Sequence, residues 1–131
     1  MILKAGKYFI GDPCYIFEDN WEQVLRDTNY FKNSNKYKIF GQECYVGDTK
    51  HGDGCYTDNK GRQYGVDTGL IGVLPATLLK VDNYVSLQKV IESDMMHIVD
   101  FEKDFEVAIH DGVFFFRDII INTKDEEVDS E

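Results

Sequence analysis

The sequence predicts one α+β domain, in which a mainly antiparallel, strongly bent sheet, or a small open barrel, packs against one or two helices. Short runs of aromatic and β-branched residues recur along the chain, separated by glycine-containing turns, which is the pattern of many short strands. Only residues 18–31 have a clear helical period. With 131 residues, 43% of them hydrophobic and 14% aromatic, the chain has enough apolar material for one packed core.

The first apolar run, residues 7–17, is cut by Gly-Asp-Pro. Because Pro13 restricts the residue before it to extended conformations, two short strands around a bend are expected. Residues 18–31 then predict an amphipathic helix of about three turns, capped by Asp19 or Asn20. Its apolar face carries Trp21, Val24, Leu25 and Thr28.

The middle of the chain is expected to form hairpins. Residues 37–46 predict two short strands separated by Gly41. Residues 54–66 predict a hairpin with Tyr56 and Tyr64 on its two strands and a turn that ends in a glycine.

The last part of the domain is dominated by strand signals. Residues 69–75 predict a strand or a close-packed turn, after which Pro75 is expected to open a short helix. Residues 83–96 have a partial helical pattern. Residues 97–123 alternate between apolar and polar side chains, and Asp111-Gly112 is a two-residue hairpin signal between two such runs. We therefore expect one globular domain over residues 1–123, followed by an acidic, disordered tail at residues 124–131.

The charge of the chain is strongly acidic, with 24 acidic residues against 14 basic ones and a formal net charge of −10. Direct binding to nucleic acid or to an anionic membrane is not expected, since both require a basic surface. A basic protein partner, or mimicry of the charge of a nucleic acid, stays open. The start of the chain lacks the layout of a signal peptide, and no apolar run reaches the length of a membrane span. A cytoplasmic protein with its three cysteines reduced is therefore expected.

A metal site is not expected, although four side chains could in principle bind zinc: Cys14, Cys44, His51 and Cys55. Structural zinc sites usually bring their ligands in close Cys-x-x-Cys pairs, and the sequence has none. Each cysteine precedes a tyrosine in a strand-like context, which favours a small buried side chain. The aspartates of residues 48–67 do not have the spacing of a calcium loop and are interpreted as turn-forming groups. We expect no other cofactor.

Two patterns suggest catalysis. Cys55 lies four residues after His51, which could act as its base. Residues 67–69 read Asp-Thr-Gly, the triplet of aspartic proteases, in which two such carboxylates meet in a dimer. The residues around the triplet do not fit that family, and a turn or backbone-capping role is favoured for Asp67. No helix N-terminus or cluster of positive charge is expected beside Cys55, so an activated thiol is not favoured either.

Three longer motifs give the chain a resemblance. They are Gly-Asp-Pro-Cys-Tyr at residues 11–15, Gly-Asp-Gly-x-Tyr-x-Asp at residues 52–58, and Val-Asp-x-Gly-x-Ile-Gly-x-x-Pro at residues 66–75. Together with the glycine-containing hairpin at residues 110–123, they resemble a group of small bacterial and phage proteins. The content of Lys, Asn, Asp and Ile is similar to that of early-expressed proteins of large tailed phages. The resemblance implies a phage-type protein but no particular activity.

The leading hypothesis is a small, acidic, non-enzymatic binding protein of phage type that contacts and inhibits a host protein, such as a defence protein. Its acidic surface would steer it to a basic patch on that partner. The candidate contact residues lie on and around the helix and near the C-terminal hairpin: Glu18, Asp19, Glu22, Asp27, Asp100, Glu102, Asp104 and Glu106.

Two alternatives remain open. A sequestering binder of a small anionic nucleotide or metabolite would use backbone amides at glycine bends together with nearby basic side chains. Its candidate residues are Lys50, His51, Gly52, Gly54, Lys60 and Arg62. A hydrolase would use Asp67 or Cys55. The sequence gives no prediction of the oligomeric state.

Overall fold

The polypeptide alternates between short strands and tight turns, and its computed structural model describes residues 1–17, 20–32, 35–78 and 92–124. Within these residues the chain forms strands β1 (Ile2–Leu3), β2 (Gly6–Gly11), β3 (Lys36–Ile39), β4 (Gln42–Asp48), β5 (Gly54–Thr57), β6 (Gln63–Val66), β7 (Leu70–Pro75), β8 (His97–Phe101), β9 (Phe105–His110), β10 (Val113–Phe116) and β11 (Ile119–Asn122). The helical elements are α1 (Cys14–Phe17), α2 (Trp21–Asp27) and a 3-10 turn, η2 (Asn29–Phe31).

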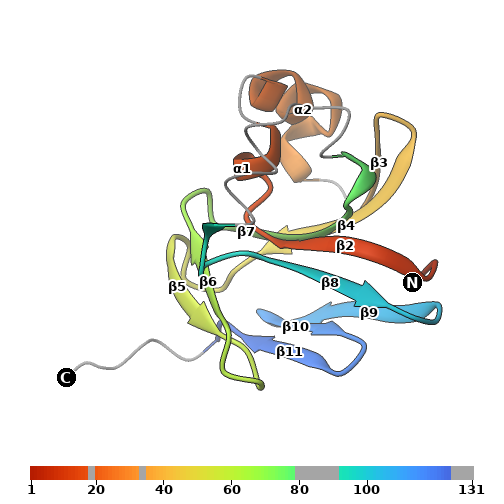
Figure 1. The fold of residues 1–131 in the computed structure, drawn as a ribbon. Coiled ribbons are helices and arrows are strands. Elements are labelled where there is room, and N and C mark those ends of the chain that lie inside the picture. Colours follow the sequence, from red (N-terminus) through yellow and green to blue (C-terminus); the bar gives the residue numbers. More distant parts are fainter. Residues whose placement is uncertain (18–19, 33–34, 79–91, 125–131) are drawn as a thin grey trace.

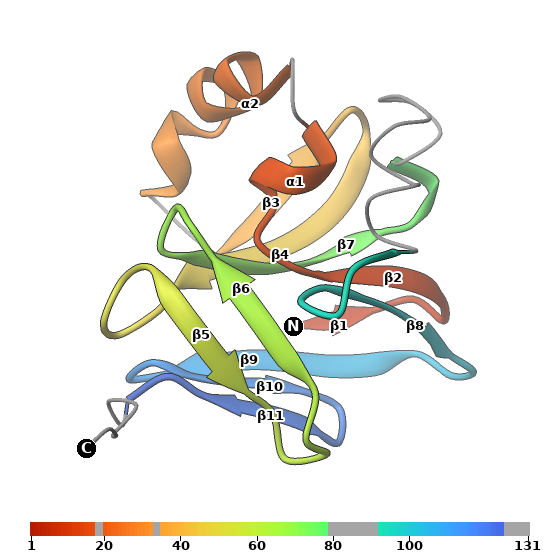
Figure 2. The same ribbon diagram turned by 60° about the vertical axis from the view of Figure 1, so that its left-hand side comes forward.

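The elements are arranged in layers (Figure 1). A five-stranded antiparallel sheet of order β3-β4-β7-β2-β8 forms the middle layer. A four-stranded antiparallel sheet of order β1-β9-β10-β11 lies on one side of it, and α1 and α2 lie on the other. The β5–β6 hairpin lies beside both sheets, as Figure 2 shows, and a β-bridge joins its residue Asp58 to Ile121 of β11.

One bent pair of strands connects the two sheets. β1 and β2 follow each other and pair with β9 and β8, with Ile2 opposite Glu106 and Gly6 opposite Phe101. The register shifts by one residue between the two ladders, and the shift falls at the turn of residues 102–104. An unmatched residue of this kind bends a strand pair locally. The sheets do not close into a barrel, so the fold is a strongly bent antiparallel sheet with packed helices, and the α+β prediction is confirmed.

Two hydrophobic cores fill the spaces between the layers. The core between the sheets includes Tyr8, Ile10, Tyr64, Ile71, Val73, Phe101, Phe105, Phe114, Phe116 and Ile121. The core under the helices includes Phe9, Ile16, Phe17, Val24, Phe31, Cys44, Val46 and Leu74. Strand β2 supplies both cores, since successive side chains of a strand point to opposite faces. Full burial of each large apolar side chain contributes about 1.5–3 kcal/mol.

The hairpin predictions are confirmed. β3 and β4 flank the turn at Gly41, and Tyr56 lies opposite Tyr64 in the β5–β6 pair. The turn between β9 and β10 has positive φ angles at both Asp111 (50°) and Gly112 (81°). Positive φ at both central residues is what a type I′ hairpin turn requires.

The second strand expected in residues 7–17 is wrong, because residues 14–17 form the helical turn α1. The Asp12 carboxylate accepts a hydrogen bond from the Cys14 amide at 3.0 Å, and the Asp12 carbonyl accepts one from the Tyr15 amide at 3.2 Å. These bonds start a helical turn directly after the proline. The strand-like context expected for all three cysteines is therefore wrong for Cys14, which begins α1, whereas Cys44 and Cys55 lie in strands.

The expected three-turn helix is shorter than predicted. α2 covers seven residues, roughly two turns, and Asn20 precedes it without a side-chain capping bond. The helix ends because Asn29, Tyr30 and Phe31 all have positive φ angles between 54° and 58°. Its predicted apolar face is correct: Val24 and Thr28 are buried, and Trp21 and Leu25 are half-buried.

Two further expectations concern the segment after β7. Pro75 is the last residue of β7, opposite Tyr8, and helical residues follow at 77–78, so the expected short helix begins two residues after the proline. Residues 79–91, which hold most of the partial helical pattern, lie outside the described residues, as do residues 125–131 of the expected tail. Among the helices that the structure describes, none has the length and apolar character needed to cross a membrane.

Candidate functional site

The acidic residues predicted to contact a partner divide into two groups. Asp100 lies on β8, Glu102 and Asp104 in the turn that follows, and Glu106 on β9, and all four are exposed. Glu22 and Asp27 are exposed on α2, which lies on the opposite side of the five-stranded sheet from β9 (Figure 1). Glu18 and Asp19 lie outside the described residues. The two groups therefore do not form one continuous patch.

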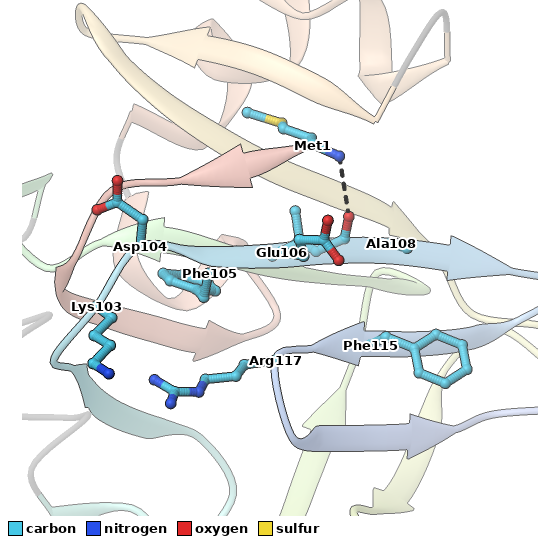
Figure 3. A pocket seen from close by; sticks show the side chains of 9 residues that line it. Met1, Lys103, Asp104, Phe105, Glu106, Ala108, Phe115 and Arg117 are labelled. Atoms are coloured by element: carbon cyan, nitrogen blue, oxygen red, sulfur yellow. Dashed lines mark hydrogen bonds between the residues drawn. The ribbon is translucent and has the colours of Figure 1, made fainter.

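The group near β8 and β9 lines two neighbouring hollows. The first, of about 520 Å³, is shown in Figure 3 and is lined by Met1, Lys103, Asp104, Phe105, Glu106, Val107, Ala108, Phe115 and Arg117. The second, of about 310 Å³, is lined by Lys60, Arg62, Val99, Asp100, Phe101, Glu102, Arg117, Asp118 and Ile119. Arg117 lines both. We call this continuous surface the turn face, since the β8–β9 and β10–β11 turns form its centre.

Acidic and basic side chains alternate over the turn face. Asp104 and Glu106 line the first hollow with Lys103, and Asp100 and Glu102 line the second with Lys60 and Arg62. A surface of this kind provides charged contacts of both signs close to partly buried apolar residues. It suits recognition of a partner with a complementary charge pattern.

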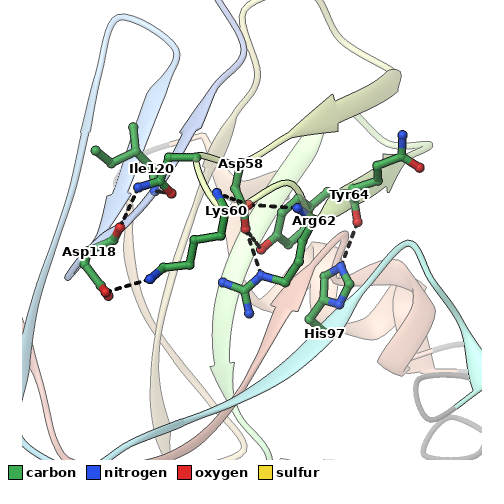
Figure 4. A network of polar contacts seen from close by, with 9 residues as sticks. Asp58, Lys60, Arg62, Tyr64, His97, Asp118 and Ile120 are labelled. Atoms are coloured by element: carbon green, nitrogen blue, oxygen red, sulfur yellow. Dashed lines mark hydrogen bonds and ion pairs between the residues drawn. The ribbon is translucent and has the colours of Figure 1, made fainter.

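A buried carboxylate fixes the basic side of the second hollow (Figure 4). The side chain of Asp58 has no solvent exposure. It accepts hydrogen bonds from the Lys60 amide at 2.8 Å, the Arg62 amide at 3.0 Å, Arg62 Nε at 3.1 Å and the Tyr64 hydroxyl at 2.7 Å. Arg62 is thereby held in one orientation at the edge of the hollow, and Lys60 Nζ pairs with Asp118 at 2.9 Å.

The pKa values of Asp58 and Tyr64 are shifted in opposite directions. Burial opposes the charged form of Asp58, but the hydrogen bonds from Tyr64 and the two amides, together with the charge of Arg62, hold the pKa of Asp58 below its ordinary value. Burial, and then the hydrogen bond to Asp58, raise the pKa of Tyr64 above its ordinary value. At neutral pH the pair is therefore a carboxylate that accepts a hydrogen bond from a neutral phenol.

Asn59 joins the β5–β6 turn to the β10–β11 turn by hydrogen bonds. Its amide donates to the Ile120 carbonyl at 2.9 Å, and the Ile120 amide donates to Asn59 Oδ1 at 2.8 Å. Asn59 Nδ2 donates to the Asp118 carbonyl at 2.9 Å. Three hydrogen bonds thus join two turns that are far apart in sequence, and they fix one wall of the second hollow.

The six residues proposed for a small anionic ligand are not brought together. Lys50 pairs with Asp111 at 2.8 Å, beside the turn before β10, whereas Lys60 pairs with Asp118, beside the turn after β10. His51 Nε2 contacts the Lys124 carbonyl at 2.7 Å. The set is therefore divided between the two ends of β5 and β10. Only Lys60 and Arg62 line a hollow of the turn face, while Lys50, His51, Gly52 and Gly54 belong to the other end.

The loop of Gly52 has a structural role. Its carbonyl accepts hydrogen bonds from the Thr49 hydroxyl at 2.6 Å and the Tyr56 hydroxyl at 2.9 Å. A side chain at Gly69, whose φ is 81°, would approach the Gly52 Cα to 3.5 Å. At both positions the positive φ angle, 82° at Gly52 and 81° at Gly69, favours glycine, and the second and third motifs meet there in van der Waals contact.

The Asp-Thr-Gly triplet is a turn held by Asp12, which is fully buried. The Asp12 carboxylate accepts hydrogen bonds from the amides of Asp67 and Thr68, both at 2.8 Å, and from the Thr68 hydroxyl at 2.8 Å. The Tyr15 hydroxyl donates to the Asp67 carboxylate, and burial together with this bond raises the Tyr15 pKa. The first and third motifs of the chain thus form one hydrogen-bonded corner.

The cysteines give no catalytic or metal-binding arrangement in the part of the chain that the structure describes. No group of three or more His, Cys, Asp and Glu side chains there is placed to hold a metal ion. Cys44 is buried, and burial raises the pKa of its thiol to about 12, so it is not nucleophilic at neutral pH. Cys55 is half-buried in β5, and the ring of its proposed base, His51, is engaged by the Lys124 carbonyl.

Sequence reasoning did not identify Arg117. This residue occupies the first position of the two-residue turn between β10 and β11, with a φ angle of 61°. The only signal in the sequence is a charged pair, Arg117-Asp118, between two apolar runs. That pair indicates a hairpin turn, but it does not show that the arginine lies between two hollows.

Comparison with protein-family models, curated proteins and solved structures gave no match for this chain.

Proposed function

We propose that this chain is a non-enzymatic binding protein that contacts a protein partner through the turn face, and that this contact inhibits the partner. The observation that carries the proposal is that Asp100, Glu102, Asp104 and Glu106 all line the two hollows of that face. A typical protein interface has a polar rim around a less polar centre. The acidic side chains would form such a rim, and the partly apolar hollows would form the centre.

The charge of the whole chain supports a basic partner. With a formal net charge of −10, the protein attracts a positively charged surface over distances of about one Debye length, roughly 8 Å at physiological ionic strength. Such steering raises the association rate more than the final affinity. The proposal that the partner is a host protein, and that the chain is of phage type and acts in the host cytoplasm, rests on the sequence resemblance alone.

The test is charge reversal at the turn face, with charge reversal on α2 as the matched control. The first variant carries Asp100→Lys, Glu102→Lys and Glu106→Lys. Asp104 is left unchanged because its carboxylate accepts a hydrogen bond from the Ala5 amide at 2.8 Å. The second variant carries Glu22→Lys and Asp27→Lys, which are also exposed but lie on the helix side. Asp27 accepts a bond from the exposed Gln23 side chain at 2.9 Å rather than from a backbone amide.

The partner is first captured from host lysate with the unmodified chain, and its dissociation constant is then measured for each variant. We expect at least about a tenfold weaker affinity for the turn-face variant, chiefly through slower association, and little change for the α2 variant. Both should keep the melting temperature of the unmodified chain. Equal binding by all three proteins, or a loss confined to the α2 variant, would exclude the turn face as the interface.

A further inference from the structure

Arg117 has a backbone conformation that favours glycine. It is the first central residue of a two-residue hairpin turn in which Phe116 pairs with Ile119. The φ angle of Arg117 is 61°, whereas its neighbour Asp118, the second central residue, does not have a positive φ. In hairpin turns with a positive φ at the first central position only, that position is usually glycine. An arginine here carries a conformational cost, and residues in such conformations cluster at functional sites.

The side chain of Arg117 extends toward a second cation. Figure 3 shows its guanidinium group directed to the side of the hollow where Lys103 lies. Neither side chain has a carboxylate within 4.0 Å among the residues described, whereas Lys50, Lys60 and Arg62 each have one. Two cations at one end of a hollow repel each other unless an anion lies between them.

The acidic residues of the same hollow are turned elsewhere. Asp104 Oδ1 accepts the hydrogen bond of the Ala5 amide at 2.8 Å, and Figure 3 shows its carboxylate pointing away from Arg117. Glu106 lies on the Met1 side of the hollow in the same view. These two carboxylates still line the hollow, so a ligand with several separate anionic groups would be repelled. A ligand with one anionic group would not be.

The opposite end of the hollow is apolar. Ala108 of β9 and Phe115 of β10 are paired across the two strands, and both are half-buried on the side that lines the hollow. A ring of the ligand could lie against Phe115 while its charged group reaches Arg117. The volume of about 520 Å³ lies within the range of small-molecule sites, which are roughly 300–1,000 Å³.

We propose that the first hollow of the turn face binds a small molecule that has a flat aromatic body and a single phosphate or carboxylate group. The anionic group accepts hydrogen bonds from the Arg117 guanidinium and pairs with Lys103, and the aromatic body packs on Phe115 and Ala108. Arginine suits this role because its planar guanidinium binds phosphate and carboxylate in a bidentate manner. The hollow is part of the turn face, but this proposal does not rest on the protein partner proposed above, because its ligand is tested on the isolated chain.

The experiment is an amide NMR titration of the ¹⁵N-labelled full chain with three probes: adenosine monophosphate, adenosine and N-benzoylglycine. The proteins are the unmodified chain, Arg117→Gly, Lys103→Gln and, as the matched control, Arg26→Gln, an exposed arginine on α2. We expect saturable shifts at the amides of Ala108, Phe115 and Arg117 with one or both anionic probes. Arg117→Gly should weaken that binding at least about tenfold, Lys103→Gln several-fold, and Arg26→Gln not at all.

Melting temperatures separate a binding role of Arg117 from a structural one. Glycine relieves the positive φ, so Arg117→Gly should melt a few degrees higher than the unmodified chain while it binds the probe less well. Binding of only the phosphate or only the carboxylate probe would identify the anionic group. The proposal is overturned if neither anionic probe binds at millimolar concentration, if adenosine binds and does so as tightly as its monophosphate, or if Arg117→Gly binds the anionic probe as tightly as the unmodified chain.

Discussion

Two buried carboxylates, Asp12 and Asp58, hold the most conspicuous motifs of the chain in place. Each accepts four hydrogen bonds that the structure assigns, and each ties together backbone amides of a tight turn. A buried charge is tolerated only when it is satisfied in this way. The motifs that suggested catalysis are therefore explained at the residue scale by what their carboxylates bind within the protein.

Substitution of Asp12 tests this structural role. Asp12→Ala leaves the amides of Cys14, Asp67 and Thr68 without their acceptor, and an unsatisfied buried donor costs about 1–3 kcal/mol. We expect the free energy of unfolding to fall by about 2–4 kcal/mol in urea denaturation. Asp53→Ala is the control, because Asp53 is exposed, and it should change stability by less than about 0.5 kcal/mol. Similar losses for both variants would contradict the role of Asp12.

The Asp58–Tyr64 hydrogen bond predicts a pH dependence. The Asp58 pKa is lowered in the folded state, so the ionised carboxylate stabilises the fold. This contribution to the free energy of unfolding is present above the unfolded pKa of about 3.9 and is lost as pH falls below it. The Tyr64 pKa is raised in the folded state, so the neutral phenol stabilises the fold. This contribution to the free energy of unfolding is complete below the unfolded pKa of about 10 and is lost as pH rises above it.

Tyr64→Phe removes this bond, and at pH 7 it should be less stable than the unmodified chain by about 1–2 kcal/mol. The difference should be largest between about pH 5 and 9 and should narrow at both extremes. Urea denaturation of both proteins from pH 3 to 11 measures it. A difference that stays constant over the whole range would show that the hydrogen bond does not couple to ionisation.

At the scale of elements, the contact of β4 with β9 depends on a glycine. A Cβ atom built at Gly47 would lie 2.2 Å from Ile109 Cδ1 and 3.0 Å from Asn35 Nδ2. Gly47→Ala should therefore reduce the free energy of unfolding by about 1–3 kcal/mol. Ile109→Val removes the atom in conflict, so it should recover part of that loss in the double variant.

A double-mutant cycle on Gly47 and Ile109, read by urea denaturation, measures this coupling. The two losses should be non-additive by about 1 kcal/mol, with the double variant more stable than the sum predicts. Simple additivity would mean that the two sheets do not meet at these residues. It would then favour a different packing of β9 on the middle sheet.

Sequence patterns predicted those elements whose geometry is set locally. The hairpins around Gly41 and Asp111-Gly112 follow from turn chemistry, and the alternation in β9 follows from its one buried face. α1 was missed because its first turn depends on Asp12, whose carboxylate is also fixed by a turn more than fifty residues away. α2 was predicted too long because the spacing of apolar residues along the sequence does not reveal the positive φ angles at residues 29–31, where the helix ends.

At the scale of the whole molecule, the candidate site could be predicted only in part. The acidic residues near β8 and β9 were identified from charge and exposure, and they do line the turn face. Their separation from Glu22 and Asp27 depends on the layer order, which local patterns do not contain. Arg117 was missed for the same reason, since its position between two hollows results from three turns that meet only in the folded chain.

The β5–β6 hairpin is expected to open separately from the layers that it lies beside. Its tip is joined to the β10–β11 turn by the three hydrogen bonds of Asn59 and by the Lys60–Asp118 ion pair. Its strands add Tyr56, Tyr64 and Val66 to one core, whereas the middle sheet contributes to both cores. Asn59→Ala should lower stability by about 1–2 kcal/mol, and hydrogen exchange measured by mass spectrometry should rise in β5, β6 and β11 but not in β2 or β7. Gln63→Ala, an exposed position on the same hairpin, should leave exchange unchanged. A uniform rise in every strand of the Asn59→Ala variant would instead show that the hairpin and both sheets unfold as one unit, and the turn face would then form and break only with the whole fold.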